Sequence, residues 1–284
     1  MIHITECPRD AMQGIDPFIP TALKTRYLNQ LLKVGFDTLD FGSFVSPKAI
    51  PQLADTAEVL AGLDLSQTDT KLLAIVANRR GAEAALSHPE IAFLGYPFSI
   101  SETFQLRNTR KNIADSFKLV KEVQEMCVQK GKKLLIYISM AFGNHYGDPW
   151  SPELAEKWVH EMVGLGIDHI AMADTTGSAD KTSIHDLFGK LLPRFPEVAI
   201  GAHFHAHPSQ RLAKIKAAWD SGCRRFDVAL QGFGGCPFAE DELVGNIATE
   251  SLLTFCQQNN IDTKLDTSVL TEVAPIVQQV FYPN

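Results

Sequence analysis

The sequence lacks several signals that would mark other classes of protein. It has no run of about 18 apolar residues, the length that crosses a membrane, and no C-x-x-C pair. Its five cysteines, at positions 7, 127, 223, 236 and 256, are too scattered to indicate a disulfide framework or a zinc finger. The opening residues MIHITECPRD suggest a strand and show no signal-peptide pattern. We therefore expect a protein of the reducing cytoplasm.

Positive charge is also scarce. Lysine and arginine number 26 against 33 acidic residues, and the formal net charge is −7. This balance disfavours nucleic acid or an anionic membrane as a partner, although local basic residues can still bind an anionic small molecule. Hydrophobic residues at 45% and charged residues at 21% are ordinary for a soluble globular protein with a substantial core.

Strand-like and helix-like segments alternate along the chain. Short apolar or β-branched runs occur at 2–7, 36–42, 71–77, 91–97, 133–140, 168–174, 198–207 and 224–230. Amphipathic spacing predicts helices over 21–35, 112–131, 151–166 and, more approximately, 180–194 and 208–221. Eight such units with short connections predict an α/β fold, a closed (β/α)8 barrel. A doubly wound open sheet is the alternative, but no G-x-G-x-x-G follows the first strand.

No linker, low-complexity tract or charge block divides the chain. We therefore expect residues 1–284 to form a single barrel domain that carries the catalytic site. Helical patterns near 247–258 and 266–281 predict a C-terminal helical extension, 247–284, beyond the eighth strand.

Polar residues capable of chemistry follow seven of the eight predicted strands. In a barrel of this type the active site forms at the carboxyl ends of the strands, so this placement predicts where the site lies. The residues are Arg9 and Asp10; Asp40 and Ser43; Ser101 and Asn108, in a predicted long loop; Ser139; Asp174; His203 and His205; and Cys236.

The most specific local pattern is the pair His203 and His205. Positions i and i+2 of a strand share a face, so both imidazoles are expected to point into the barrel mouth, with Asp10 facing them. Packing among polar neighbours is the alternative for either ring. Two imidazoles and a carboxylate form a mixed nitrogen and oxygen set that suits Mg²⁺ or Mn²⁺ more than Zn²⁺.

Three charged residues near the predicted mouth each allow two interpretations. Arg9 can be a structural ion-pair partner or a cation aimed at a developing oxyanion. Asp40 can accept from backbone amides or pair with Arg9. Asp174 can cap a helix or support the site.

Cys236 lies in the glycine-rich segment QGFGGCP. The glycines and Pro237 predict a mobile or sharply turned loop instead of a packed strand. A thiol on such a loop at a catalytic mouth can act as proton donor, nucleophile or redox sensor.

Taken in order, these segments resemble the 3-hydroxy-3-methylglutaryl-CoA lyase family of metal-dependent barrel lyases, essentially from end to end. The matching segments are PRDAMQ (8–13), SFVSPKAIPQ (43–52), SETFQLRN (101–108) with DSF (115–117), His203-Phe204-His205, and GGCP with the following GN.

The resemblance implies a role for each residue of the site. Arg9 would be the catalytic arginine and Cys236 the proton donor, while the base is open among Asp10, Asp40 and His203. Asp10, His203, His205 and Asn246 would hold the divalent ion. The predicted substrate contacts are Gln13, Ser43, Asn108, Ser139, Asp174 and Lys48, the last either at a CoA phosphate or simply solvated.

The implied reaction is retro-Claisen cleavage of 3-hydroxy-3-methylglutaryl-CoA, a step of leucine degradation, by a homodimer. A related synthase that condenses a 2-oxo acid with acetyl-CoA is the closest alternative, and a non-catalytic barrel that binds acyl-CoA or metal is a more distant one.

The chain departs from the family pattern at four places. Ala11 replaces a glycine, Asp40 stands where glutamate is common, and Ala206 replaces an aspartate. The segment from Cys236 to Asn246 is one residue longer than expected and contains Glu240-Asp241-Glu242. The last two departures bear on substrate specificity.

Overall fold

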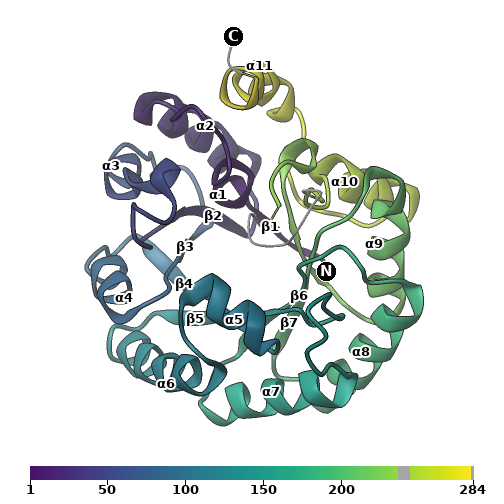
Figure 1. Ribbon diagram of the computed structural model, residues 1–284. Coiled ribbons are helices and arrows are strands. Elements are labelled where there is room, and N and C mark those ends of the chain that lie inside the picture. Colours follow the sequence, from purple (N-terminus) through teal and green to yellow (C-terminus); the bar gives the residue numbers. More distant parts are fainter. Residues whose placement is uncertain (236–243, 283–284) are drawn as a thin grey trace.

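The strands form one closed parallel barrel in which each strand pairs with its neighbours in sequence order and β1 also pairs with β8 (Figure 1). A computed structural model describes residues 1–235 and 244–282. The strands are β1 (His3–Glu6), β2 (Thr38–Ser43), β3 (Lys71–Ile75), β4 (Ile91–Ser99), β5 (Lys133–Ser139), β6 (His169–Asp174), β7 (Ala199–Phe204) and β8 (Arg225–Val228). The predicted (β/α)8 barrel is confirmed.

Helices surround the barrel, most of them on its outer side (Figure 1). They are α1 (Pro8–Met12), α2 (Thr21–Val34), α3 (Thr56–Ala61), α4 (Arg79–Leu86), α5 (Glu102–Thr109), α6 (Ile113–Gln129), α7 (Pro152–Gly164), α8 (Lys181–Arg194), α9 (Arg211–Asp220), α10 (Thr249–Gln258) and α11 (Leu270–Phe281). Short 3-10 turns occupy Pro51–Leu53, Pro208–Gln210 and Leu230–Gly232. Within residues 1–235 and 244–282, every helix falls short of the length and apolar character that a membrane span requires.

The strands are buried on both faces, as expected where helices cover the outside of a parallel sheet. The main core fills the layer between strands and helices. A second, smaller cluster fills the inside of the barrel and consists of Leu73, Ile75, Leu135, Tyr137 and Ala171. The remaining interior positions are therefore available to polar groups.

Two local features differ from the sequence-based expectation. The residues after β1 turn at once into the short helix α1, with Pro8 in its first turn, where no helix was predicted. Asn108 lies on helix α5 and not in a long loop, because Ser101 caps that helix by accepting from the Phe104 N–H. Both helices are too short for hydrophobic periodicity to identify them.

The last two helices return the chain to its beginning. Helix α11 packs on α2, where the rings of Tyr27 and Phe281 lie 5.9 Å apart. At the start of α10, the Thr249 hydroxyl donates to the buried Glu6 carboxyl at 2.6 Å, and the Leu230 N–H donates to the same group at 2.7 Å. Residues of β1, the 3-10 turn after β8, and α10 therefore share one buried carboxyl.

Burial of Glu6 predicts a specific pH dependence of stability. Desolvation raises its pKa to about 8, although the two hydrogen bonds oppose the shift. The folded state then favours the protonated acid, so the free energy of unfolding falls as pH rises from about 4.5 to about 8, by about 1.4 kcal/mol per pH unit.

We expect Glu6→Gln, which is neutral in both states, to remove this slope in urea unfolding measured across that range. Glu125→Gln is the matched control, because Glu125 is an exposed residue of helix α6 that does not contribute to the Glu6 shift. Equal slopes for the wild-type protein and Glu6→Gln would contradict the assignment.

Candidate active site

A pocket of about 420 Å³ lies at the carboxyl ends of the strands. It collects most of the side chains that the sequence indicated, although these come from different strand–helix units. The predicted residues that line it are Arg9, Asp10, Gln13, Ser43, Lys48, Asn108, Ser139, His203 and His205.

Arg9 is fixed by a fork of buried hydrogen bonds. Its Nε and Nη2 donate to Asp40, at 3.0 Å and 2.6 Å to Oδ2, and its Nη1 donates to Asp10 Oδ1 at 3.0 Å. Nη1 also donates to Gln13 Oε1 at 3.0 Å. Helix α1 presents Arg9, Asp10 and Gln13 together because it begins directly after β1. The guanidinium is therefore held at the pocket wall in one orientation.

Opposed electrostatic effects set the ionisation of the two carboxyls around Arg9. Burial disfavours the charged form of Asp10, but Arg9 and both histidines outweigh it and lower its pKa to about 2. Burial dominates at Asp40 and raises its pKa to about 6, although Arg9 opposes this. The guanidinium itself loses solvation, yet the neighbouring carboxylates raise its pKa, so Arg9 stays charged.

Asp10, His203 and His205 bring three ligand atoms within 4.8 Å of one another, all buried. Asn246 joins this group, because its amide donates to Asp10 Oδ2 at 2.6 Å and to the Phe233 carbonyl at 2.8 Å. Both amide hydrogens are then used, which leaves the Asn246 carbonyl oxygen free to act as a ligand.

The outer nitrogens of both histidines are already engaged. His203 Nδ1 lies 3.2 Å from Asp227 Oδ2, and His205 Nδ1 lies 3.2 Å from the Val244 carbonyl. Partners of this kind fix the tautomer and turn each Nε2 toward an ion. Burial and the neighbouring His203 lower the pKa of His205 to about 4, which keeps its ring neutral and able to bind a cation.

The Asp10–Asn246 hydrogen bond depends on a close approach of the Gly234 backbone to both side chains. The φ of Gly234 is +99°, and a Cβ there would lie 2.5 Å from Asn246 Nδ2 and 3.0 Å from Asp10 Oδ2. A side chain at this position would separate the two residues. The glycines of this segment thus provide sharp turns, one of the two readings of the sequence.

Of the predicted residues that the structure describes, Asp40, Ser101, Asp174 and Asn246 do not line this pocket. Asp40 is fully buried behind Arg9 and does not line the pocket. Asp174 accepts from Lys214 Nζ at 2.6 Å and from the Ala179 N–H, away from the pocket lining, and the cap of α8 is Asp180. Asn246 meets the site only through Asp10 and the segment around His205. Cys236, like Glu240-Asp241-Glu242, lies outside the described residues.

The sequence did not single out two residues that lie next to His203. Asp227 stands opposite His203 in the register of β7 and β8 and holds its ring. Tyr137 lines the pocket with its ring centroid 5.3 Å from that of His203. Both were read only as members of apolar strands, and alternation along the strands, given the register, would have turned them inward.

These residues fit a divalent cation. One carboxylate, two neutral imidazole nitrogens and an amide oxygen form a mixed set, with room for further oxygen ligands in the pocket. Cys7, His203 and Asp227 form a second group of possible ligands. Burial raises the pKa of Cys7 well above its usual value, and the hydrogen bond to Asp227 occupies that side of His203, so the first set fits better.

Comparison with known proteins shows the family to which the chain belongs. A family model described as HMGL-like matches residues 2–277. The chain belongs to the HMGL-like family. The chain is therefore an enzyme, a carbon–carbon lyase. Its family is dependent on a divalent metal ion.

Among curated HMGL-like relatives, a hydroxymethylglutaryl-CoA lyase of Bacillus subtilis is 31% identical over 96% of this chain and 90% of its own length. A (R)-citramalyl-CoA lyase of Chloroflexus aurantiacus is also 31% identical, over 93% of this chain and 85% of its own. An HMG-CoA lyase structure from Acinetobacter baumannii, solved with coenzyme A and 3-methylmalate, has a TM-score of 0.91 at 33% identity and covers 99% of this chain and 91% of its own.

The His203–Asp227 contact gives a test of the ion site. We expect Asp227→Asn to lower Mn²⁺ affinity about 10- to 100-fold, because the ring loses its charged partner. Titration calorimetry measures this directly. Asp37→Asn is the control, since Asp37 holds His3 at 2.8 Å at the other end of the barrel. Unchanged affinity in Asp227→Asn would remove Asp227 from the ion site.

Proposed function

We propose that this chain cleaves 3-hydroxy-3-methylglutaryl-CoA to acetoacetate and acetyl-CoA. The carrying observation is the convergence, in one buried pocket, of a fixed guanidinium and the ligand group Asp10, His203 and His205. A retro-Claisen cleavage needs both, because a hydroxyl must lose its proton while negative charge builds on a thioester oxygen. Most of the curated relatives considered are named for this reaction.

We propose Asp10, His203, His205 and Asn246 as the residues that hold a divalent ion, with Mg²⁺ or Mn²⁺ favoured over Zn²⁺ because no thiolate belongs to the set. When bound, the ion supplies Lewis-acid stabilisation of substrate oxygens.

The Arg9 guanidinium would stabilise the negative charge that C–C cleavage places on the thioester oxygen. This group lines the pocket, stays charged, and is oriented before substrate arrives by Asp40, Asp10 and Gln13. Preorganised donors stabilise a developing oxyanion without reorganising during the reaction. Asp40 acts here as a positioning residue.

The contacts of Asp40, Asp10 and His203 bear on the proposed choice of base. Asp40 does not line the pocket and is occupied by Arg9, which removes it from direct contact with a substrate hydroxyl. Asp10 and His203 remain as alternatives. A pKa of about 2 makes the Asp10 carboxylate a weak acceptor, and His203 can accept a proton only if its Nε2 is not bound to the ion, because its Nδ1 is held by Asp227. Asp227 lies behind His203 and raises the pKa of its ring against the effect of burial.

We propose Cys236 as the acid that completes the reaction. Loss of the hydroxyl proton and breakage of the C–C bond leave acetoacetate and the enolate of acetyl-CoA. Transfer of the thiol proton to the enolate carbon then gives acetyl-CoA. The neighbouring described residues, Gly234 and Phe233, contact Asn246 and so lie next to the ligand group.

The pocket rim supplies contacts for a CoA thioester. Lys48, Arg110 and Lys111 line the same pocket and provide cationic groups suited to phosphates. Gln13, Ser43, Asn108 and Ser139 are proposed as polar contacts to the acyl part. Asp174, tied to Lys214, is proposed to support the site from behind. We further propose a cytoplasmic homodimer of single-barrel subunits with a C-terminal helical extension.

A panel of thioesters tests the proposed substrate. With Mg²⁺ or Mn²⁺, the protein is expected to release acetoacetate from 3-hydroxy-3-methylglutaryl-CoA faster than it releases pyruvate from (R)-citramalyl-CoA. The second substrate is included because its lyase is equally similar in sequence. Faster cleavage of (R)-citramalyl-CoA would make that thioester the assigned substrate. If neither thioester is cleaved, the proposed lyase reaction is wrong.

Substitution of Cys236 tests the proton donor. Cys236→Ala is expected to lower kcat by about 10²- to 10⁴-fold, the contribution typical of a positioned acid, while Mn²⁺ binding is kept. Cys127→Ala is the control, because it removes a thiol buried in helix α6. Equal turnover in Cys236→Ala and the control would return Cys236 to a structural role.

A further inference from the structure

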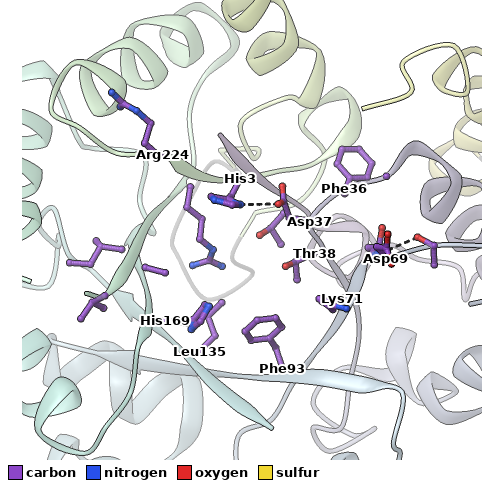
Figure 2. A pocket seen from close by; sticks show the side chains of 18 of the residues that line it. His3, Phe36, Asp37, Thr38, Asp69, Lys71, Phe93, Leu135, His169 and Arg224 are labelled. Carbon is purple, nitrogen blue, oxygen red and sulfur yellow. Dashed lines mark hydrogen bonds and ion pairs between the residues drawn. The ribbon is translucent and has the colours of Figure 1, made fainter. Parts of the chain in front are cut away.

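A second cavity, of about 930 Å³, opens at the amino-terminal end of the barrel, opposite the active site. Its lining includes the first residues of several strands, among them His3, Lys71, His169 and Arg225. Figure 2 shows His3, Lys71, Phe93 and His169 arranged around the opening, with Arg224 farther out. The proposed lyase reaction uses none of these side chains.

The Arg225 guanidinium has too few hydrogen-bond acceptors among the residues that the structure describes. The residue is 8% exposed and lines the cavity. Within residues 1–235 and 244–282, its guanidinium makes one side-chain hydrogen bond, a long one of 3.4 Å from Nη2 to Asp227 Oδ1, and Nη1 has no partner. A guanidinium carries five N–H donors, and burial without acceptors is costly. The geometry therefore leaves an unfilled need for an acceptor.

Asp227 cannot meet that need. Its other oxygen bonds to His203 at 3.2 Å, and Thr5 also donates to it. Three acids line the cavity, Asp37, Asp69 and Glu197, and the last two are exposed. Asp37 accepts from His3 and the Ile4 N–H at 2.8 Å each, and Asp168, outside the lining, is held by Lys133 and His169.

The barrel makes room for Arg225. A Cβ at Gly201 on the adjacent strand β7 would lie 2.9 Å from Arg225 Cγ and 3.1 Å from its carbonyl oxygen. Any larger residue would push this side chain out of its place beside β7. The buried guanidinium is thus accommodated by the neighbouring strand.

The surrounding wall combines charged and apolar groups, with three acids, Asp37, Asp69 and Glu197, against four lysines and arginines. Lys33, Lys71 and Arg224 add positive charge, and Phe36, Phe93 and Leu135 supply apolar surface. The Phe93 and His169 rings lie 5.0 Å apart and form one side of the cavity. A planar carboxylate matches the guanidinium fork, and a short apolar body matches the aromatic wall.

We propose that this cavity is a second binding site, specific for a small organic carboxylate, with Arg225 as its anchoring cation. The site is separate from the proposed lyase pocket and holds whether or not the substrate assignment above is correct.

Sodium isobutyrate is a suitable probe. Isobutyramide, which has the same shape but no charge, tests the need for a carboxylate, and inorganic phosphate serves as the competing anion. We expect isobutyrate to bind the full chain, measured by titration calorimetry, and Arg225→Gln to weaken that binding at least about tenfold. Arg9→Gln should leave it unchanged, which separates the cavity from the active site. Arg194→Gln, an exposed arginine that pairs with Glu156, is the matched control.

Methyl NMR of the unsubstituted protein keeps the test independent of folding in Arg225→Gln. Isobutyrate should shift the Leu135 methyl signals, which belong to this cavity, and leave those of Val45, which lines the active-site pocket. Lys71→Gln should weaken binding several-fold. Equal binding of isobutyramide, retained affinity in Arg225→Gln, or shifts at Val45 alone would overturn the site. Tighter binding of phosphate than of isobutyrate would overturn its carboxylate class.

Discussion

Compensation of buried charge governs the interior of this barrel. Asp10, Asp40 and Asp227 are all buried, and each would be costly to ionise alone. Arg9 stands between Asp10 and Asp40, and His203 stands between Asp10 and Asp227. Because acidic and basic side chains alternate, several charged groups can be buried together at this end of the barrel. The hydrogen bonds between them also fix the orientation of each side chain.

The same constraint explains why small residues occur where the charges meet. Gly234 lets Asn246 reach Asp10, and Gly201 lets Arg225 lie beside β7. Ala171 and Gly95, with small or absent side chains, stand among the apolar residues of the interior. Apolar packing and polar networks therefore divide the inside of the barrel, with the apolar cluster between two polar ends.

Much of this could be predicted from the sequence because a parallel barrel imposes a simple rule. Strands alternate with helices, and residues that follow strands gather at one mouth, so Arg9, Asp10, His203 and His205 could be placed together without coordinates. Asp227 and Arg225 could not, because they lie within a strand that is buried on both faces. Only the pairing of β7 with β8 shows which side chain meets which. Asp174 followed the rule for position, but its pairing with Lys214 depends on how α9 packs, which spacing alone does not specify.

The contacts around Asn246 affect how the neighbouring segment can change. Asn246 donates to the Phe233 carbonyl at 2.8 Å, and Ala206 N–H donates to the Gly245 carbonyl at 2.8 Å, so the chain is pinned on both sides of residues 236–243. Because both ends are fixed, residues can be added or removed between them without moving the ligand group, at a small entropic cost. The extra residue that the family resemblance implies between Cys236 and Asn246 would be a change of this kind. The Asp10, His203, His205 and Asn246 group is therefore held by contacts that do not depend on how many residues join Phe233 to Gly245.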